Sequence, residues 1–146
     1  MDLDRDEIER CIPHRVPFLW IDEVMAIDDK SIRAKKFLDP ALEVFSGHYP
    51  GFPVLPGVLL CEMALQAAAV LIARLDAAGG GTIPVATRLN NAQFRRMVRP
   101  GETVDITVEL TERLSNAWFF SGKLAVDGQV AARLEFACTA TAATNR

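Results

Sequence analysis

The sequence has little cysteine, and its three cysteines form no recognisable pattern. Cys11, Cys61 and Cys138 include no C-x-x-C pair of the kind that binds zinc, and their odd number argues against a closed disulfide framework. Cys61 and Cys138 stand among apolar neighbours, where a reduced thiol behaves as a small apolar side chain. We therefore expect no metal ion and a reducing, cytoplasmic setting.

An excess of positive charge is also missing. The formal net charge is −3, so the chain has no general attraction for phosphate backbones, and we expect no binding to nucleic acid. The start, MDLDRDEIER, is highly charged and lacks the apolar core of a signal peptide. Half of the 146 residues are apolar and 24% are charged, as in soluble globular proteins, and this length suits a single domain over residues 1–146.

One stretch, residues 54–75, is apolar enough to resemble a membrane span. Glu62 and Gln66 lie near its middle, where a charged group in a bilayer costs several kcal/mol. Pro56 suits the first turn of a helix, because its missing N–H would have no partner there, and three glycines at 79–81 end the segment. We expect a helix buried in protein up to residue 75, and no membrane span.

The N-terminal part is typical of a short helix followed by two strands. Asp4 and Glu7 have the spacing of a capping box, which predicts a helix directly behind them. Strands are expected at residues 18–27 and 32–38, joined by a turn, and a loop rich in proline and glycine is expected over residues 40–57.

The last third of the chain is rich in strands. Residues 103–110 alternate apolar and polar side chains, as a half-buried strand does. Asp127–Gly128, between the runs 116–126 and 129–140, is a strong signal for a two-residue hairpin. A helix that is apolar on nearly every side must be covered, and a curved antiparallel sheet is the element available. The pattern therefore predicts an α+β fold in which the sheet wraps the long helix.

Only two histidines are present, so the search for a base active near neutral pH is short. His48 lies in the segment 47–53, GHYPGFP, where two glycines and two prolines restrict the backbone and would fix the direction of the imidazole. By spacing alone, a structural hydrogen bond is the more common role for such a histidine. His14, between two prolines, is expected to brace its loop.

Glu62 strengthens the case for catalysis. It stands among apolar residues of the expected helix, where an unpaired carboxyl group tends to stay protonated and can donate a proton to a leaving hydroxyl group. Gln66 follows one helical turn later and could orient it. The alternative is a carboxylate satisfied by a structural partner such as an arginine.

The start of the expected helix supplies a third group. The backbone N–H groups at and after Gly57 lack intrahelical acceptors and lie at the positive end of the helix dipole. They can bind a carbonyl oxygen and stabilise an enolate, and glycine lets a substrate approach the backbone closely. Every helix has such an end, so this feature is informative here only because Gly57 lies between His48 and Glu62 in the sequence.

Residues 47–66, GHYPGFPVLPGVLLCEMALQ, closely resemble the signature of the β-hydroxyacyl-[acyl-carrier-protein] dehydratases of the FabZ type. Residues 12–19, IPHRVPFL, and 92–102, AQFRRMVRPGE, extend the resemblance in the family's order. The resemblance implies a hotdog fold, an antiparallel sheet wrapped around one long central helix. It also implies dehydration of a (3R)-hydroxyacyl thioester on acyl carrier protein to the trans-2-enoyl thioester, in fatty-acid or related acyl-chain biosynthesis, without a cofactor.

Carried onto this chain, the family pattern makes His48 and Glu62 the catalytic pair, facing each other from different subunits of a homodimer. The N–H of Gly57 would hold the thioester carbonyl. The carbonyl of Val54 would accept a hydrogen bond from the histidine ring, and Gln66 would support the carboxyl group. Such proteins often assemble further into homohexamers, as trimers of dimers. The implied partner is an acyl carrier protein bearing a phosphopantetheine-linked acyl chain.

The sequence departs from the family pattern beside the catalytic pair. Tyr49 replaces the usual phenylalanine, and Phe52 stands where a basic or polar residue is common, which bears on the carrier or chain that is accepted. Glutamate rather than aspartate at position 62 is similar to the FabZ type and unlike the bifunctional dehydratase–isomerases, so we expect no isomerase activity.

Arg95, Arg96 and Arg99 form the densest basic cluster of the sequence. Acyl carrier proteins are acidic, so this cluster would steer docking. The alternative is a solvated strand end, which is the more common meaning of a charge run.

Two other functions remain open on the same fold. An acyl thioesterase would need a water-directing carboxylate near the helix start and could manage without a histidine in this loop. A non-catalytic acyl-binding subunit would be free to lose either His48 or Glu62, and this sequence keeps both.

Overall fold

The computed structural model describes residues 3–76 and 82–142. Within them lie the helices α1 (Arg5–Cys11), α2 (Glu43–Gly47) and α3 (Gly57–Leu75). The strands are β1 (Glu23–Ile27), β2 (Ser31–Phe37), β3 (Thr82–Phe94), β4 (Thr103–Leu114), β5 (Ala117–Val126) and β6 (Gln129–Ala142).

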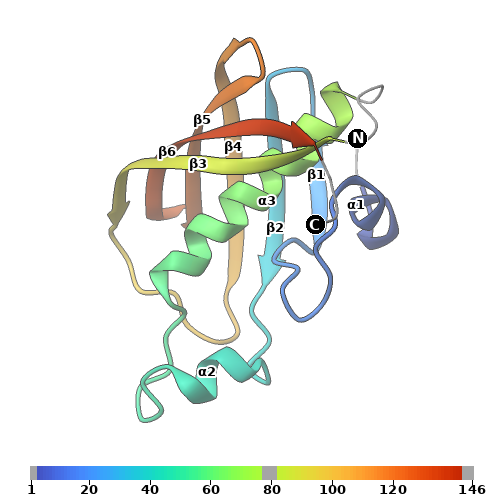
Figure 1. Ribbon diagram of the computed structural model, residues 1–146. Helices are drawn as coiled ribbons and strands as arrows, with labels where there is room; N and C mark the ends of the chain where they lie inside the picture. The colour runs from blue at the N-terminus through green and yellow to red at the C-terminus, as the bar shows by residue number, and fades with distance from the viewer. Residues whose placement is uncertain (1–2, 77–81, 143–146) are drawn as a thin grey trace.

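The six strands form one antiparallel sheet in the order β1-β2-β4-β5-β6-β3. The sheet curves around α3, which runs along its concave side, while α1 lies beside β1 and α2 lies below the strands (Figure 1). The prediction of an α+β hotdog fold, with the sheet wrapped around one long helix, is confirmed.

Helix α3 owes its apolar composition to its place in the core. Its middle is buried on all sides, including Met63, Ala64 and Leu71, which are inaccessible to solvent. By length and composition α3 could cross a membrane, since its apolar stretch has a mean hydropathy of 1.9. However, 61% of this stretch is buried inside the protein. At Gly122 of β5 an added Cβ would lie 3.2 Å from the Cβ of Ala64, which shows how closely the sheet approaches the helix.

Two local predictions are confirmed. Asp4 caps α1, because its Oδ1 accepts a hydrogen bond from the N–H of Glu7 while the Glu7 carboxylate accepts one from the N–H of Asp4. The turn between β5 and β6 has φ values of 50° at Asp127 and 79° at Gly128, the left-handed pair that a tight hairpin requires. The glycines at 79–81 lie outside the described residues.

The predictions for the loops need two corrections. Strand β1 begins at Glu23 rather than at residue 18, because backbone groups of Phe18 and Trp20 bond to the side chain of Gln66 instead of to a neighbouring strand. Residues 40–57 are not all loop, since they contain α2. A helix of five residues is too short to produce a readable periodicity.

Strand β3 has no counterpart among the sequence-based predictions, because its sequence, TIPVATRLNNAQF, lacks regular alternation. It pairs with β6 and is an edge strand of the described sheet. One side of an edge strand has no neighbouring strand, and on that side the missing N–H of Pro84 costs no hydrogen bond. Ile83, Val85 and Leu89 are 39%, 42% and 50% exposed. Thus β3 offers a long, partly apolar edge on which another strand can pair.

Candidate active site

His48 is held by a backbone carbonyl at the end of α2. Its Nδ1 lies 2.8 Å from the carbonyl oxygen of Val54, and its ring packs against Tyr49 with 4.5 Å between centroids. Because a carbonyl oxygen can only accept, Nδ1 must carry the proton of this hydrogen bond. In the neutral ring Nε2 is then unprotonated, which is the form that can remove a proton from a substrate.

Helix α3 begins at Gly57, and Pro56 before it makes no side-chain capping bond. The N–H of Gly57 therefore belongs to the first turn, whose N–H groups point away from the helix and have no intrahelical acceptors. This helix start opens onto a cleft of about 510 Å³, lined by Val54, Leu55, Gly57, Val58, Leu60, Phe94, Arg95, Arg96, Met97 and Val98.

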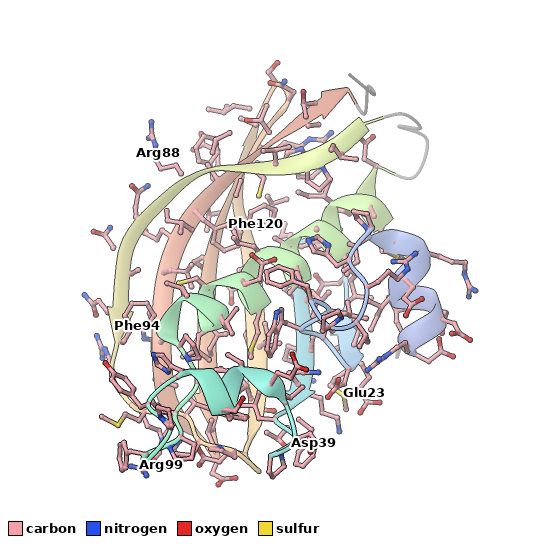
Figure 2. The ribbon with its side chains drawn as sticks, turned by 60° about the horizontal axis from the view of Figure 1, so that its bottom comes forward. Glu23, Asp39, Arg88, Phe94, Arg99 and Phe120 are labelled. Carbon is pink, nitrogen blue, oxygen red and sulfur yellow. The ribbon has the colours of Figure 1, made fainter. Side chains whose placement is uncertain are left out.

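The ring of Phe94 lies close against Gly57. A Cβ built on Gly57 would lie 2.9 Å from two ring carbons of Phe94. Figure 2 shows Phe94 at the end of β3, on the side of the molecule where α3 begins. A side chain at position 57 would therefore require the ring of Phe94, which is 53% exposed, to move.

Gln66 is fully buried and connects α3 to the N-terminal loop. Its Oε1 accepts from the N–H of Trp20 at 2.8 Å, and its Nε2 donates to the carbonyl of Phe18 at 2.8 Å and to Oε2 of Glu62 at 3.0 Å. The backbone partners fix which end of the amide is nitrogen, because an N–H needs an acceptor and a carbonyl needs a donor. Gln66 therefore presents a donor to Glu62 in a set orientation.

Glu62 faces a cavity of about 150 Å³ beside the sheet edge. The cavity is lined by Glu62 with His14, Leu65, Ala69, Pro84, Ala86 and Cys138. The carboxylate side chain is 22% exposed in the protomer. Most of the lining is apolar, and the Gln66 amide is the hydrogen-bond donor that the structure gives to this carboxylate. A molecule bound in this cavity would lie against the carboxyl group.

His14 is a second neighbour of the carboxylate, with its Nε2 at 3.7 Å from Oε2 of Glu62. The sequence indicated only that His14 braces its loop. Positions 14 and 62 belong to segments far apart in the chain, so no spacing rule could have joined them.

His48 and Glu62 take different partners within one protomer. His48 bonds to Val54 in the loop before α3, whereas Glu62 contacts Gln66 and His14 at the N-terminal loop. The structure thus joins Val54 to His48 and Gln66 to Glu62, and leaves the two candidate catalytic side chains in separate settings.

The arginine cluster divides into two kinds of residue. Arg96 forms a bidentate ion pair with Glu102, at 3.0 and 2.7 Å, and its guanidinium holds the pKa of that carboxyl below its ordinary value. Arg99 instead stacks on Phe52, with its guanidinium carbon 4.6 Å from the ring centroid, and Arg95 bonds to the neighbouring side chain of Gln93. Arg96 therefore maintains the loop, and the other two are the better candidates for an interaction surface.

The cysteines offer no nucleophile for this site. Burial raises the pKa of Cys138, which lines the cavity, to about 11, and burial also raises the pKa of Cys61 beside Glu62. Both thiols are therefore protonated near neutral pH, and a thiol is a poor nucleophile. Among residues 3–76 and 82–142 there is also no group of three side chains suited to hold a metal ion.

Comparison with known proteins identifies the family to which this chain is similar. The model of the FabA-like domain matches residues 12–135. A protein of Rickettsia massiliae named 3-hydroxyacyl-[acyl-carrier-protein] dehydratase FabZ is 40% identical over 137 residues, which cover 93% of this chain and 94% of that protein. A protein of the same name from Rickettsia felis is 39% identical over the same length.

Similarity to solved structures supports the fold. The dehydratase heterocomplex ApeI:P from Xenorhabdus doucetiae has a chain that superposes with a TM-score of 0.79 at 18% identity, covering 93% of this chain and 91% of that one. A hypothetical thioesterase from Streptococcus pneumoniae has a TM-score of 0.65 at 11% identity, with coverage of 82% and 84%. Both likenesses concern the arrangement of the helix and sheet.

Proposed function

The chain belongs to the family of FabA-like domains, and on that basis we propose that it dehydrates a (3R)-hydroxyacyl thioester on acyl carrier protein to the trans-2-enoyl thioester. It is a hydro-lyase, and its pathway is fatty-acid or related acyl-chain biosynthesis in the cytoplasm. The observation that carries the proposal is the bond from His48 Nδ1 to the Val54 carbonyl. That bond leaves Nε2 of a fixed imidazole free to act as a base.

The reaction needs one base, one acid and one oxyanion site. Nε2 of His48 takes the α-proton while the N–H of Gly57 stabilises the negative charge that develops on the thioester oxygen. Glu62 gives its proton to the β-hydroxyl group, so that the C–O bond breaks and water leaves. The electron pair of the α-C–H bond becomes the new double bond. The thioester acidifies the α-carbon, and the proposed steps use only side chains and backbone of the protein.

The proposed active unit is a homodimer formed along β3. A second copy on this edge would cover Ile83, Val85 and Leu89, which are exposed in the protomer. Because Pro84 and Ala86 of β3 also line the cavity at Glu62, a chain bound there closes that cavity. The partner would supply its His48 opposite Glu62, which accounts for the separate settings of the two side chains in one protomer. We propose further that three such dimers assemble into a hexamer.

Replacing Gly57 by alanine is expected to lower kcat/KM by about tenfold or more, because the new methyl group collides with Phe94 and displaces the carbonyl from the helix start. The measurement is steady-state dehydration by the G57A variant. The double variant G57A/F94L, in which a smaller side chain faces the methyl group, should recover part of the loss. Wild-type kinetics in G57A would show that close approach at Gly57 does not matter to the reaction.

Reversing the charge at Arg95 and Arg99 is expected to raise KM for a substrate on acyl carrier protein by about tenfold, because the carrier is acidic, Arg95 lines the cleft and Arg99 is exposed nearby in the sequence. KM for the same acyl group on a small thioester carrier should change little. The matched control reverses Arg33 and Lys123, two exposed residues on the outer face of the sheet. If both charge reversals raised KM for the carrier-bound substrate equally, the effect would come from the net charge of the protein rather than from a docking site.

The assay that tests the proposed function follows the enoyl absorbance during hydration of crotonyl and longer enoyl thioesters, on acyl carrier protein and on coenzyme A. Release of free thiol without formation of a hydroxyacyl product would identify an acyl thioesterase instead. Binding of the acyl thioester without either reaction would identify a non-catalytic subunit. Turnover on the carrier-bound substrate supports the dehydratase.

A further inference from the structure

His14 occupies a position that the proposed mechanism does not yet use. It lies in the loop between α1 and β1, and its ring stacks on Phe18 with 6.4 Å between centroids and 25° between the planes. Its Nε2 is 3.7 Å from Oε2 of Glu62, and both side chains line the cavity of about 150 Å³. The side chain is 29% exposed, so much of the ring lies inside the protein.

The two ring nitrogens of His14 have different surroundings. Nδ1 is buried and has no hydrogen-bond partner among the residues that the structure describes. A proton on Nδ1 would be a buried donor without an acceptor, whereas a proton on Nε2 points toward an oxygen of Glu62. The neutral ring therefore keeps its proton on Nε2, the nitrogen that faces Glu62.

The two oxygens of Glu62 are consequently not equivalent. Oε2 accepts the N–H of Gln66 at 3.0 Å and also faces the Nε2–H of His14. An oxygen approached by two N–H donors is a poor place for the acidic proton, since a hydroxyl there would point its hydrogen at other hydrogens. The proton of the neutral carboxyl group therefore belongs on Oε1.

We infer that His14 is a positioning residue, whose Nε2–H joins Gln66 in holding Oε2 as an acceptor so that Oε1 presents its proton to the β-hydroxyl group. This inference rests on the proposed dehydration by Glu62. The separation of 3.7 Å suits a contact that tightens when substrate fills the cavity, because such hydrogen bonds are often long in the unliganded enzyme. The other residues lining the cavity are apolar apart from the protonated thiol of Cys138, so they offer Oε2 no comparable donor.

The test compares two pairs of variants. His14→Phe keeps a ring that can stack on Phe18 but removes both nitrogens. His14→Gln keeps an N–H donor near the position of Nε2, whereas His14→Asn has a side chain too short to place its amide there. Dehydration kinetics and the thermal unfolding midpoint are measured for each variant, with wild type and Glu62→Gln as references.

We expect H14F to lower kcat by about 10- to 100-fold with KM within about twofold, because the lost interaction matters in the transition state rather than in binding. Its unfolding midpoint should be unchanged or higher, because phenylalanine removes the buried Nδ1 that has no partner. H14Q should recover a larger share of kcat than H14N. If H14F does not fold, the difference between H14Q and H14N still decides the matter.

Two results would overturn the inference. Wild-type kcat in H14F, or equal kcat in H14Q and H14N, would show that the Nε2–H does not act on Glu62. A fall in kcat accompanied by an equal loss of stability in all variants would assign His14 a structural role only. Failure of the proposed function is recognised separately, because then wild type itself does not dehydrate the substrate or E62Q retains full activity.

Discussion

Replacing His48 by alanine or Glu62 by glutamine is expected to lower turnover of the hydroxyacyl thioester by about 10²- to 10⁴-fold, the usual range for loss of a general base or acid. Alanine removes the imidazole whose Nδ1 is anchored to Val54, so no group remains to take the α-proton. Glutamine keeps the size of Glu62 and can still contact Gln66, but it cannot transfer a proton to the leaving hydroxyl group.

Both variants should remain folded, because neither side chain belongs to the buried core: the carboxylate is 22% exposed and the imidazole stands in a surface loop. Circular dichroism and thermal unfolding measure this directly. Since each residue acts in the transition state, KM should change less than kcat. A variant that is folded and dehydrates at the wild-type rate would remove its residue from the mechanism.

Co-expression of H48A and E62Q chains is expected to restore about a quarter of wild-type activity. If each site takes His48 from one chain and Glu62 from the other, a mixed dimer has one intact site and one site lacking both groups. Random pairing makes about half of the dimers mixed, and half of their sites are intact. The restored activity would stand far above that of either variant alone.

The control for this experiment pairs E62Q with a chain that carries both substitutions. No arrangement of those two chains assembles an intact His48–Glu62 pair, so activity should stay at the level of the single variants. Sedimentation of the mixtures establishes that dimers form in each case. Lack of restoration with H48A and E62Q in mixed dimers would place both residues of a site in one chain and would contradict the dimer along β3.

The central helix and the meander were readable from the sequence because their signals are local. The apolar run that ends at residue 75 has no breaker inside it, and Asp127–Gly128 specifies its turn through two left-handed backbone positions. Strand β3 gave no such signal, since an edge strand with exposed side chains on both faces has no need for regular alternation. Its position depends on pairing with β6, which only the folded chain shows.

The candidate site was predictable to the extent that it is contained in one segment. Val54, Gly57 and Gln66 lie in or close to the loop and first turns of α3, so their relation to His48 and Glu62 follows from helical spacing and from the resemblance to the family. The ion pair between Arg96 and Glu102 was not predictable, because the turn between these two residues is what brings their side chains together. His14 lies near Glu62 only in the folded chain, where Gln66 bonds to the backbone of the loop that carries His14.

The irregularities of β3 have a consequence for which proteins can attach to it. Its register with β6 shifts between Ala86 and Arg88 and again between Asn90 and Gln93, and Asn91 has a φ of 51°. A flat border of this length would recruit extended segments indiscriminately and seed aggregates. The kinked outline of β3 disfavours pairing with a regular, flat strand. In the proposed dimer the second copy covers this edge, so the kinks protect β3 mainly before the two chains associate.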